Sequence, residues 1–186
     1  MPTFSEMSTV GGHLCGEVAS ALQKAIRRGH EREALYWATE LDLTGYGNYV
    51  WKRLRIIASE DVGLADPEAV LLVRALNGNW LEHRKANKED LSAALFLCHA
   101  VIVLAHAKKS RIVDHALLVM YEGEREQLEI PDYALDKHTA RGRRMKRGFD
   151  HFFDEGAQLE NAADIEDPYY EEARAAHTTW SSTRPT

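Results

Sequence analysis

Cysteine is scarce in this sequence, and long hydrophobic runs are missing. The 186 residues include two cysteines, Cys15 and Cys98, which lie far apart within apolar helical patterns. A free cysteine in such a setting usually behaves as a small buried hydrophobe, so we expect neither a disulfide nor a catalytic thiol. No apolar run reaches the roughly 18 residues that a membrane-spanning helix needs. The amino terminus has no basic stretch followed by an apolar core, so we expect a cytoplasmic protein without membrane contact.

Several catalytic motifs are also missing. The sequence has no GxxxxGK[ST] phosphate loop, which would surround a triphosphate with backbone amides and a lysine. Neither Ser59 nor Ser110 lies in a GxSxG setting, and there is no HExxH or paired-cysteine pattern. We therefore favour a non-enzymatic protein over an enzyme, and we expect no cofactor.

Helical periodicity dominates what is present. Apolar residues recur at three-to-four spacing through most of the chain, and no stretch alternates long enough to indicate a sheet. This pattern predicts an all-α fold, an antiparallel helical bundle with short connections. We expect a flexible lead-in over residues 1–12, a single helical domain over 13–160, and a loosely ordered acidic and polar tail over 161–186.

In the second half of the predicted bundle, the sequence indicates specific helix ends and inward-facing residues. Asn77-Gly78-Asn79 should end a helix that starts at Pro67, and the polar segment 83–90 should form a loop. Leu91 to Ala107 is apolar nearly all round and should be the central core helix. Ser110 can cap a sixth helix, whose inward residues would be Val113, Ala116, Leu117 and Met120.

The most clearly punctuated stretch is RLRIIASEDVGLADP, from Arg53 to Pro67. Leu54 and Ile57 end an amphipathic helix, Gly63 can take the positive φ that terminates one, and Asp66-Pro67 is typical of a helix start. We expect capping and interface roles for seven residues of this turn: Arg53, Ser59, Glu60, Asp61, Gly63, Asp66 and Pro67.

Three segments resemble the carboxyl-terminal region of the RarA/MgsA family of AAA+ ATPases, which act in replication-fork maintenance and recombination. They are ALQKAIRRGHEREALYWATEL (21–41), RLRIIASEDVGLADPEAV (53–70) and HAVIVLAHAKKSRIVDHAL (99–117). Their order and spacing agree over about 100 residues, and the turn ASEDVGLADP is the most specific part. The resemblance ends after about Met120.

In that family the matching region is a helical domain related to clamp-loader collars, through which subunits assemble into tetramers. The resemblance implies the same fold here and a homo-oligomer, either a dimer or a tetramer. It also implies an oligomerisation or protein-interaction role in DNA replication, recombination or repair, with a replication or recombination protein as a partner. It does not carry over an ATPase, because the family's nucleotide-binding module lies amino-terminal to this region. We expect a stand-alone collar-like domain.

Contact with DNA is a further expectation, based on the distribution of charge. The formal net charge is -6, yet residues 137–147 carry six Lys or Arg and no acid, and residues 150–172 carry nine acids and no Lys or Arg. The basic block predicts either a phosphate-binding patch or a solvated helix paired with the acidic segment. Trp51 and Trp80 could stack on bases, although large aromatics more often pack in a core. The candidate phosphate-binding residues are Lys108, Lys109, Arg111, Arg141, Arg143, Arg144, Lys146 and Arg147.

The alternative function is a metal-dependent enzyme, of hydrolase or nuclease type, that uses the His/Asp/Glu-rich segment 132–155. Such a site needs two or three of these groups to converge in the fold, whereas helix capping and ion pairs with Arg141–Arg147 would also explain them. The candidate metal ligands are Asp136, His138, His151 and Glu155.

Overall fold

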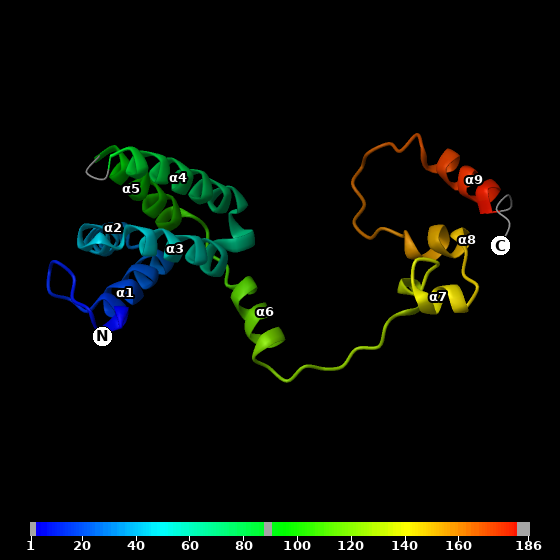
Figure 1. Cartoon of the computed structure of the whole chain (residues 1–186), viewed down its shortest axis with the longest axis horizontal. Helices are drawn as coiled ribbons and strands as arrows, with labels where there is room; N and C mark the ends of the chain where they lie inside the picture. The colour runs from blue at the N-terminus through cyan, green and yellow to red at the C-terminus, as the bar shows by residue number, and fades with distance from the viewer. Residues whose placement is uncertain (1–2, 88–90, 182–186) are drawn as a thin grey trace. The chain divides into compact units, whose positions relative to one another are not determined.

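The computed structural model describes residues 3–87 and 91–181, and within these ranges the regular structure is helical (Figure 1). Ser8 and Leu14 form an isolated β-bridge, and the described residues contain no strand. The predicted all-α fold is therefore confirmed. No helix in this part of the chain is both long enough and apolar enough to cross a membrane.

The chain divides into two compact units, residues 1–125 and 126–186, which we call unit one and unit two. We had expected a single helical domain over residues 13–160. All the side chains of residues 115–134 are exposed. The segment around the boundary at Arg125 therefore contributes no buried residue to either unit.

The described residues of unit one form six α-helices and four short helical turns. α1 pairs with α2, α4 pairs with α5, and α5 also packs against α1 and α2 (Figure 1). The α-helices are α1 (Cys15–Arg28), α2 (Glu31–Leu41), α3 (Gly47–Ile57), α4 (Pro67–Ala86), α5 (Leu91–His106) and α6 (Ile112–Tyr121). The turns are η1 (Phe4–Glu6), η2 (Asp42–Tyr46), η3 (Ala58–Val62) and η4 (Gly63–Ala65).

The core of unit one follows the predicted apolar stripes. α1 buries Val18, Leu22 and Ile26 on one face, and Gly29 ends it with φ of 73°. α5 buries Leu97, Val101 and Leu104, as a central helix should. Leu95 of α5 is nevertheless 67% exposed, so α5 is covered on fewer sides than its composition predicted.

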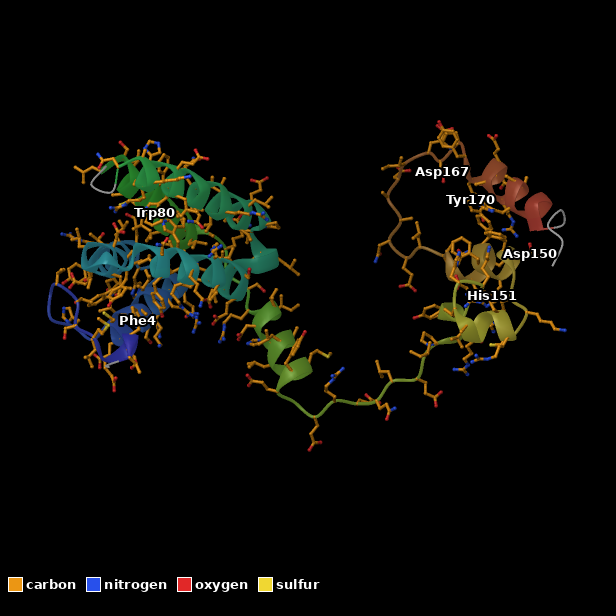
Figure 2. The ribbon with its side chains drawn as sticks, in the orientation of Figure 1. Phe4, Trp80, Asp150, His151, Asp167 and Tyr170 are labelled. Carbon is orange, nitrogen blue, oxygen red and sulfur yellow. The ribbon has the colours of Figure 1, made fainter. Side chains whose placement is uncertain are left out.

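Residues 3–12, for which we expected a flexible lead-in, lie against the bundle. The ring of Phe4 is 4.1 Å from that of Tyr49, centroid to centroid, and its place in unit one is labelled in Figure 2. Thr9 donates a 2.6 Å hydrogen bond to the buried Glu40 carboxylate, and this bond lowers the Glu40 pKa. Specific contacts therefore hold the first residues in place.

The predicted end of the fourth helix at Asn77-Gly78-Asn79 is wrong, because α4 continues to Ala86. The continuation buries Trp80, which is 4% exposed and packs 6.0 Å from the Trp51 ring. Burying an indole outweighs the roughly 1 kcal/mol that Gly78 costs inside a helix. Trp51 is also buried, so neither ring offers a face to nucleic-acid bases. The predicted loop at 83–90 is helical up to Ala86, and its residues 88–90 lie outside the described ranges.

The prediction that one face of the sixth helix packs into the core of this chain is also wrong. Val113 is 40%, Leu117 51% and Met120 61% exposed, and none of the ten residues of α6 is buried. The reason is that α6 packs on the turns η3 and η4 and extends away from the other helices of unit one (Figure 1).

Unit two is small, and many of its internal contacts are between aromatic side chains. Phe149 stacks on His177 at 4.1 Å, Phe153 lies 6.0 Å from Tyr170, and α9 lies within the segment that we expected to be a loosely ordered tail. In this unit Figure 2 labels Asp150, His151, Asp167 and Tyr170. The elements of unit two are η5 (Asp132–Ala134), α7 (Ala140–Arg144), α8 (Phe149–His151), η6 (Phe152–Gly156) and α9 (Tyr170–Ser181).

Candidate interaction site at the motif turn

The turn between α3 and α4 is built as its residues predicted. α3 runs into the π-helical turn η3, and Gly63 then reverses the chain with φ of 51° and ψ of -122°. Asp66 accepts a 3.0 Å hydrogen bond from the backbone N–H of Ala69, and Pro67 occupies the first position of α4. The turn therefore both ends one helix and starts the next.

Asp61 is the buried centre of this turn. Its side chain is fully buried, and its Oδ1 accepts a 2.6 Å hydrogen bond from Nε of Arg27 on α1. Gln23, one turn earlier on α1, donates to Oδ2 at 3.2 Å. The hydrogen bond to Asp61 raises the pKa of Arg27. A buried carboxylate is tolerated here because a charged partner and an amide both satisfy it.

The same turn holds the start of α6. The backbone N–H of Ser110 donates to the Asp61 carbonyl at 2.9 Å, and Arg111 Nε lies 3.7 Å from Asp61 Oδ1. Arg111 also bonds Asp114, and Arg27 Nη2 lies 3.0 Å from Glu60 Oε1. These contacts tie α1, the turn and α6 together through one set of charges.

Gly63 brings α6 close to the turn. A Cβ added at Gly63 would lie 3.2 Å from Cγ2 of Val113, and the positive φ is itself unfavourable for any other residue. Glycine is therefore needed at this position for both its backbone conformation and its size.

An open groove runs beside the turn, between α3 and α6. Its apolar lining comes from Ile56, Val113 and Leu117, and the exposed cations Lys52 and Arg55 lie along the α3 side. Ser59, Glu60 and Asp114 complete the lining. Arg53 is turned away from this groove, since its guanidinium donates to Gln23 on α1.

Residues 30–180 match the family model described as the MgsA AAA+ ATPase C terminal. The chain belongs to this family. The resemblance that the turn predicted is therefore confirmed. The expectation that it ends after about Met120 is wrong, because the match continues to residue 180.

Curated relatives agree with this assignment. Replication-associated recombination protein A of Bacillus subtilis (strain 168) is 32% identical over 148 residues, which cover 75% of this chain and 34% of the relative. The protein of the same name in Escherichia coli (strain K12) is 34% identical over 66% of this chain and 26% of its own length. ATPase WRNIP1 of Dictyostelium discoideum is 33% identical over 64% of this chain and 13% of its own length. The chain thus spans about a third or less of these relatives.

Half of the candidate phosphate-binding residues in this MgsA C-terminal domain are engaged within the chain. Lys109 Nζ donates to the carbonyls of Ala105, at 3.0 Å, and Ala107, at 2.5 Å, and its burial lowers its pKa. Arg111 belongs to the turn network, as described above. In unit two, Arg143 donates to the His138 carbonyl at 2.9 Å.

Arg147 is engaged by three hydrogen bonds within unit two. Its guanidinium donates to the carbonyls of Asp132, at 2.8 Å, and Leu135, at 3.0 Å, and to the Asp132 carboxylate at 2.5 Å. Lys108, Arg141, Arg144 and Lys146 are exposed. DNA contact stays a prediction.

The candidate metal ligands separate into pairs. His138 Nδ1 lies 2.7 Å from Asp136 Oδ2 and lowers the Asp136 pKa, whereas His151 Nε2 lies 3.7 Å from Asp132 Oδ2. Glu155 is exposed in η6. Within residues 3–87 and 91–181, no group of three or more His, Cys, Asp and Glu residues could hold a metal ion. A metal-dependent activity stays a prediction without support from this geometry.

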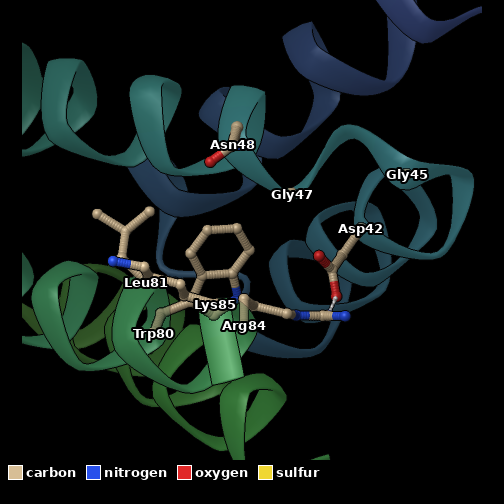
Figure 3. Close-up of a pocket in the computed structure, with 8 residues that line it drawn as sticks. All are labelled: Asp42, Gly45, Gly47, Asn48, Trp80, Leu81, Arg84 and Lys85. Carbon is tan, nitrogen blue, oxygen red and sulfur yellow. Dashed lines mark hydrogen bonds and ion pairs between the residues drawn. The ribbon is translucent and has the colours of Figure 1, made fainter. Parts of the chain in front are cut away.

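Sequence reasoning missed another carboxylate with little exposure, that of Asp42, whose side chain is 9% exposed. Arg84 Nη2 donates to Asp42 Oδ2 at 2.6 Å, and both residues line an open pocket of about 530 Å³ together with Trp80 (Figure 3). Burial raises the Asp42 pKa more than Arg84 lowers it. A Cβ at Gly47 would meet both Asp42, at 2.3 Å, and Trp80, at 2.7 Å. The wrongly placed end of α4 hid this site, because Arg84 was expected in a loop.

Proposed function

We propose that this MgsA C-terminal domain is a non-enzymatic assembly domain, which joins copies of its own chain in DNA replication, recombination or repair. The context comes from the family and from the names of the curated relatives, two of which are called replication-associated recombination proteins. The assembly role comes from the surface of the domain itself.

The observation that carries the proposal is the exposure of α6. Monomeric proteins rarely expose a contiguous apolar patch of this kind, and such patches usually mark interaction sites. A ten-residue helix is also marginal in water unless it packs against something. Seven large apolar residues of α6 are at least 40% exposed: Ile112, Val113, Leu117, Leu118, Val119, Met120 and Tyr121.

The motif turn supports an assembly role because it fixes α6 in place. Asp61, Arg27 and Arg111 form the ion-pair network that anchors the helix start, while the remainder of α6 is left open. A rigid anchor lowers the entropy lost when a partner binds. The residues most specific to the family resemblance thus serve to present α6.

Light scattering coupled to size-exclusion chromatography tests the proposal. The full chain should have the mass of a dimer or tetramer at high micromolar concentration and shift toward monomer on dilution. A monomeric mass across the whole range would overturn the proposal.

A further inference from the structure

We propose that two copies of this chain pair around a two-fold axis with their α6 helices antiparallel, each copy's α6 lying in the groove beside the other's. This inference rests on the self-association proposed above and adds to it an interface, a direction and a set of charge contacts. Three observations carry it, and each concerns a different part of the surface.

The first observation is the apolar stripe of α6. Val113, Ala116, Leu117 and Met120 recur at the spacing that places side chains on one face of a helix. Their pattern is typical of a core, yet none of the four is buried within this chain. Ala116 is small, which permits close approach of another helix at the middle of the stripe. The stripe therefore resembles half of a helix-helix contact.

The second observation is the groove that continues this stripe. Ile56 of α3 is 37% exposed and faces the same open space as Val113 and Leu117. An α-helix with its side chains is about 10 Å across. A helix laid along the stripe would cover Ile56 together with the α6 residues, so α3 extends the contact beyond α6 alone.

The third observation is charge complementarity between the two ends of this surface. Lys52 and Arg55 are exposed beside the first half of α6, whereas Glu122 and Glu124 are exposed just past its end. The carbonyls at the end of α6 add partial negative charge there. In an antiparallel pair, the acidic end of one helix meets the basic side of the other groove. A parallel pair would bring like charges together.

The occupant favoured by these observations is a second copy rather than an acidic apolar peptide from another protein. Val113, Leu117 and both cations line one groove, and the two acids follow the end of the same helix, so a second copy would supply both an apolar stripe and the charges that complement the groove. Self-complementarity is the requirement of a two-fold interface, in which every contact occurs twice.

The first test breaks the apolar contact. Leu117→Asp in the full chain should reduce the mass in solution to that of the monomer at concentrations where the original chain self-associates. Leu71→Asp is the matched control, because Leu71 is 68% exposed on α4, away from the groove, and this variant should keep the original mass. Circular dichroism should show unchanged helix content in both variants, since both side chains are exposed.

The second test reverses the charges and then restores their complementarity. Either Lys52→Glu with Arg55→Glu, or Glu122→Lys with Glu124→Lys, should weaken self-association by about tenfold. All four changes together should recover most of the original affinity. Arg32→Glu with Arg74→Glu, exposed cations on α2 and α4, is the control and should have no effect.

The outcomes separate this inference from the proposed function. A chain that is monomeric throughout overturns both. A chain that self-associates with Leu117→Asp unchanged keeps the assembly role and overturns the α6 interface. Loss of assembly in both charge variants without recovery in the combined variant overturns the antiparallel direction. A monomeric chain that binds an acidic apolar peptide only when Leu117 is intact would assign the groove to that peptide instead.

Discussion

Each of the two units is stabilised internally, and the interactions that stabilise unit one differ from those that stabilise unit two. Unit one buries Leu22, Ile26 and Val101 in a continuous aliphatic core and places its charge network at the edge of that core. In the described part of unit two, Leu135 is the one large aliphatic side chain that is buried, and Arg147 and Thr139 bond to backbone groups around it. A core made by a repeating apolar pattern is readable from sequence. A unit held by individual aromatic and polar contacts is not.

Removing the cation that faces Asp61 should have the largest effect on stability. Arg27→Met keeps much of the side-chain volume but leaves a fully buried carboxylate without its main partner. We expect a loss of about 4 kcal/mol in the free energy of unfolding of unit one, measured by urea denaturation.

Arg28→Met is the control for that experiment. Arg28 is the next residue, is exposed, and donates only a 3.3 Å bond to the Lys24 carbonyl. We expect a change of about 0.5 kcal/mol or less, as for most surface substitutions. Equal effects of the two variants would show that the Asp61 network contributes nothing specific.

Gly142→Ala should have the next largest effect, and it should act on unit two. An added Cβ would lie 1.7 Å from the Asp136 carbonyl oxygen, so the backbone must move. We expect a loss of about 3 kcal/mol from overpacking, seen as faster hydrogen exchange of amides in residues 132–156. Gly148→Ala is the control, because nothing lies within 4 Å of its Cβ position. Faster exchange in both variants would mean that unit two is sensitive to any added side chain. The close approach between Gly142 and the Asp136 carbonyl would then not be the specific cause.

Gly63→Ala should have a smaller effect in unit one. The positive φ and the contact with Val113 both oppose a side chain, and we expect a cost of about 2 kcal/mol. Gly78→Ala provides the opposite case, because Gly78 lies inside α4 with open space around it. There we expect a gain of about 1 kcal/mol from helix propensity. A loss at Gly78 would contradict the continuous α4.

Acid should weaken unit two by a modest amount. The hydrogen bond from Arg147 holds the Asp132 pKa below its ordinary value, so the contact stabilises the folded state above that value. The contribution is lost as the pH falls through the lowered pKa. In Arg147→Ala, hydrogen exchange of unit two should therefore change less between pH 5 and about pH 3 than in the original chain. Identical pH dependence would remove Arg147 as the cause.

Sequence reasoning identified the all-α fold, the family and the capping of α4 by Asp66, because each depends on local pattern. It missed the partners of Asp61 and Asp42, because Arg27 lies 34 residues and Arg84 42 residues away along the chain. For α6 the periodicity was read correctly and its environment was not. A helical stripe predicts that a face is covered, but it does not say by which chain.

The hydrogen bond from the Ser110 N–H to the Asp61 carbonyl links the stability of the domain to its association. The bond joins the folded bundle to the helix that would meet a second copy, so folding and association share one equilibrium. Under the proposed pairing, the melting temperature of this domain should rise with protein concentration, as it does for any protein whose folded state binds a partner. The same dilution series should leave the melting temperature of Leu117→Asp unchanged.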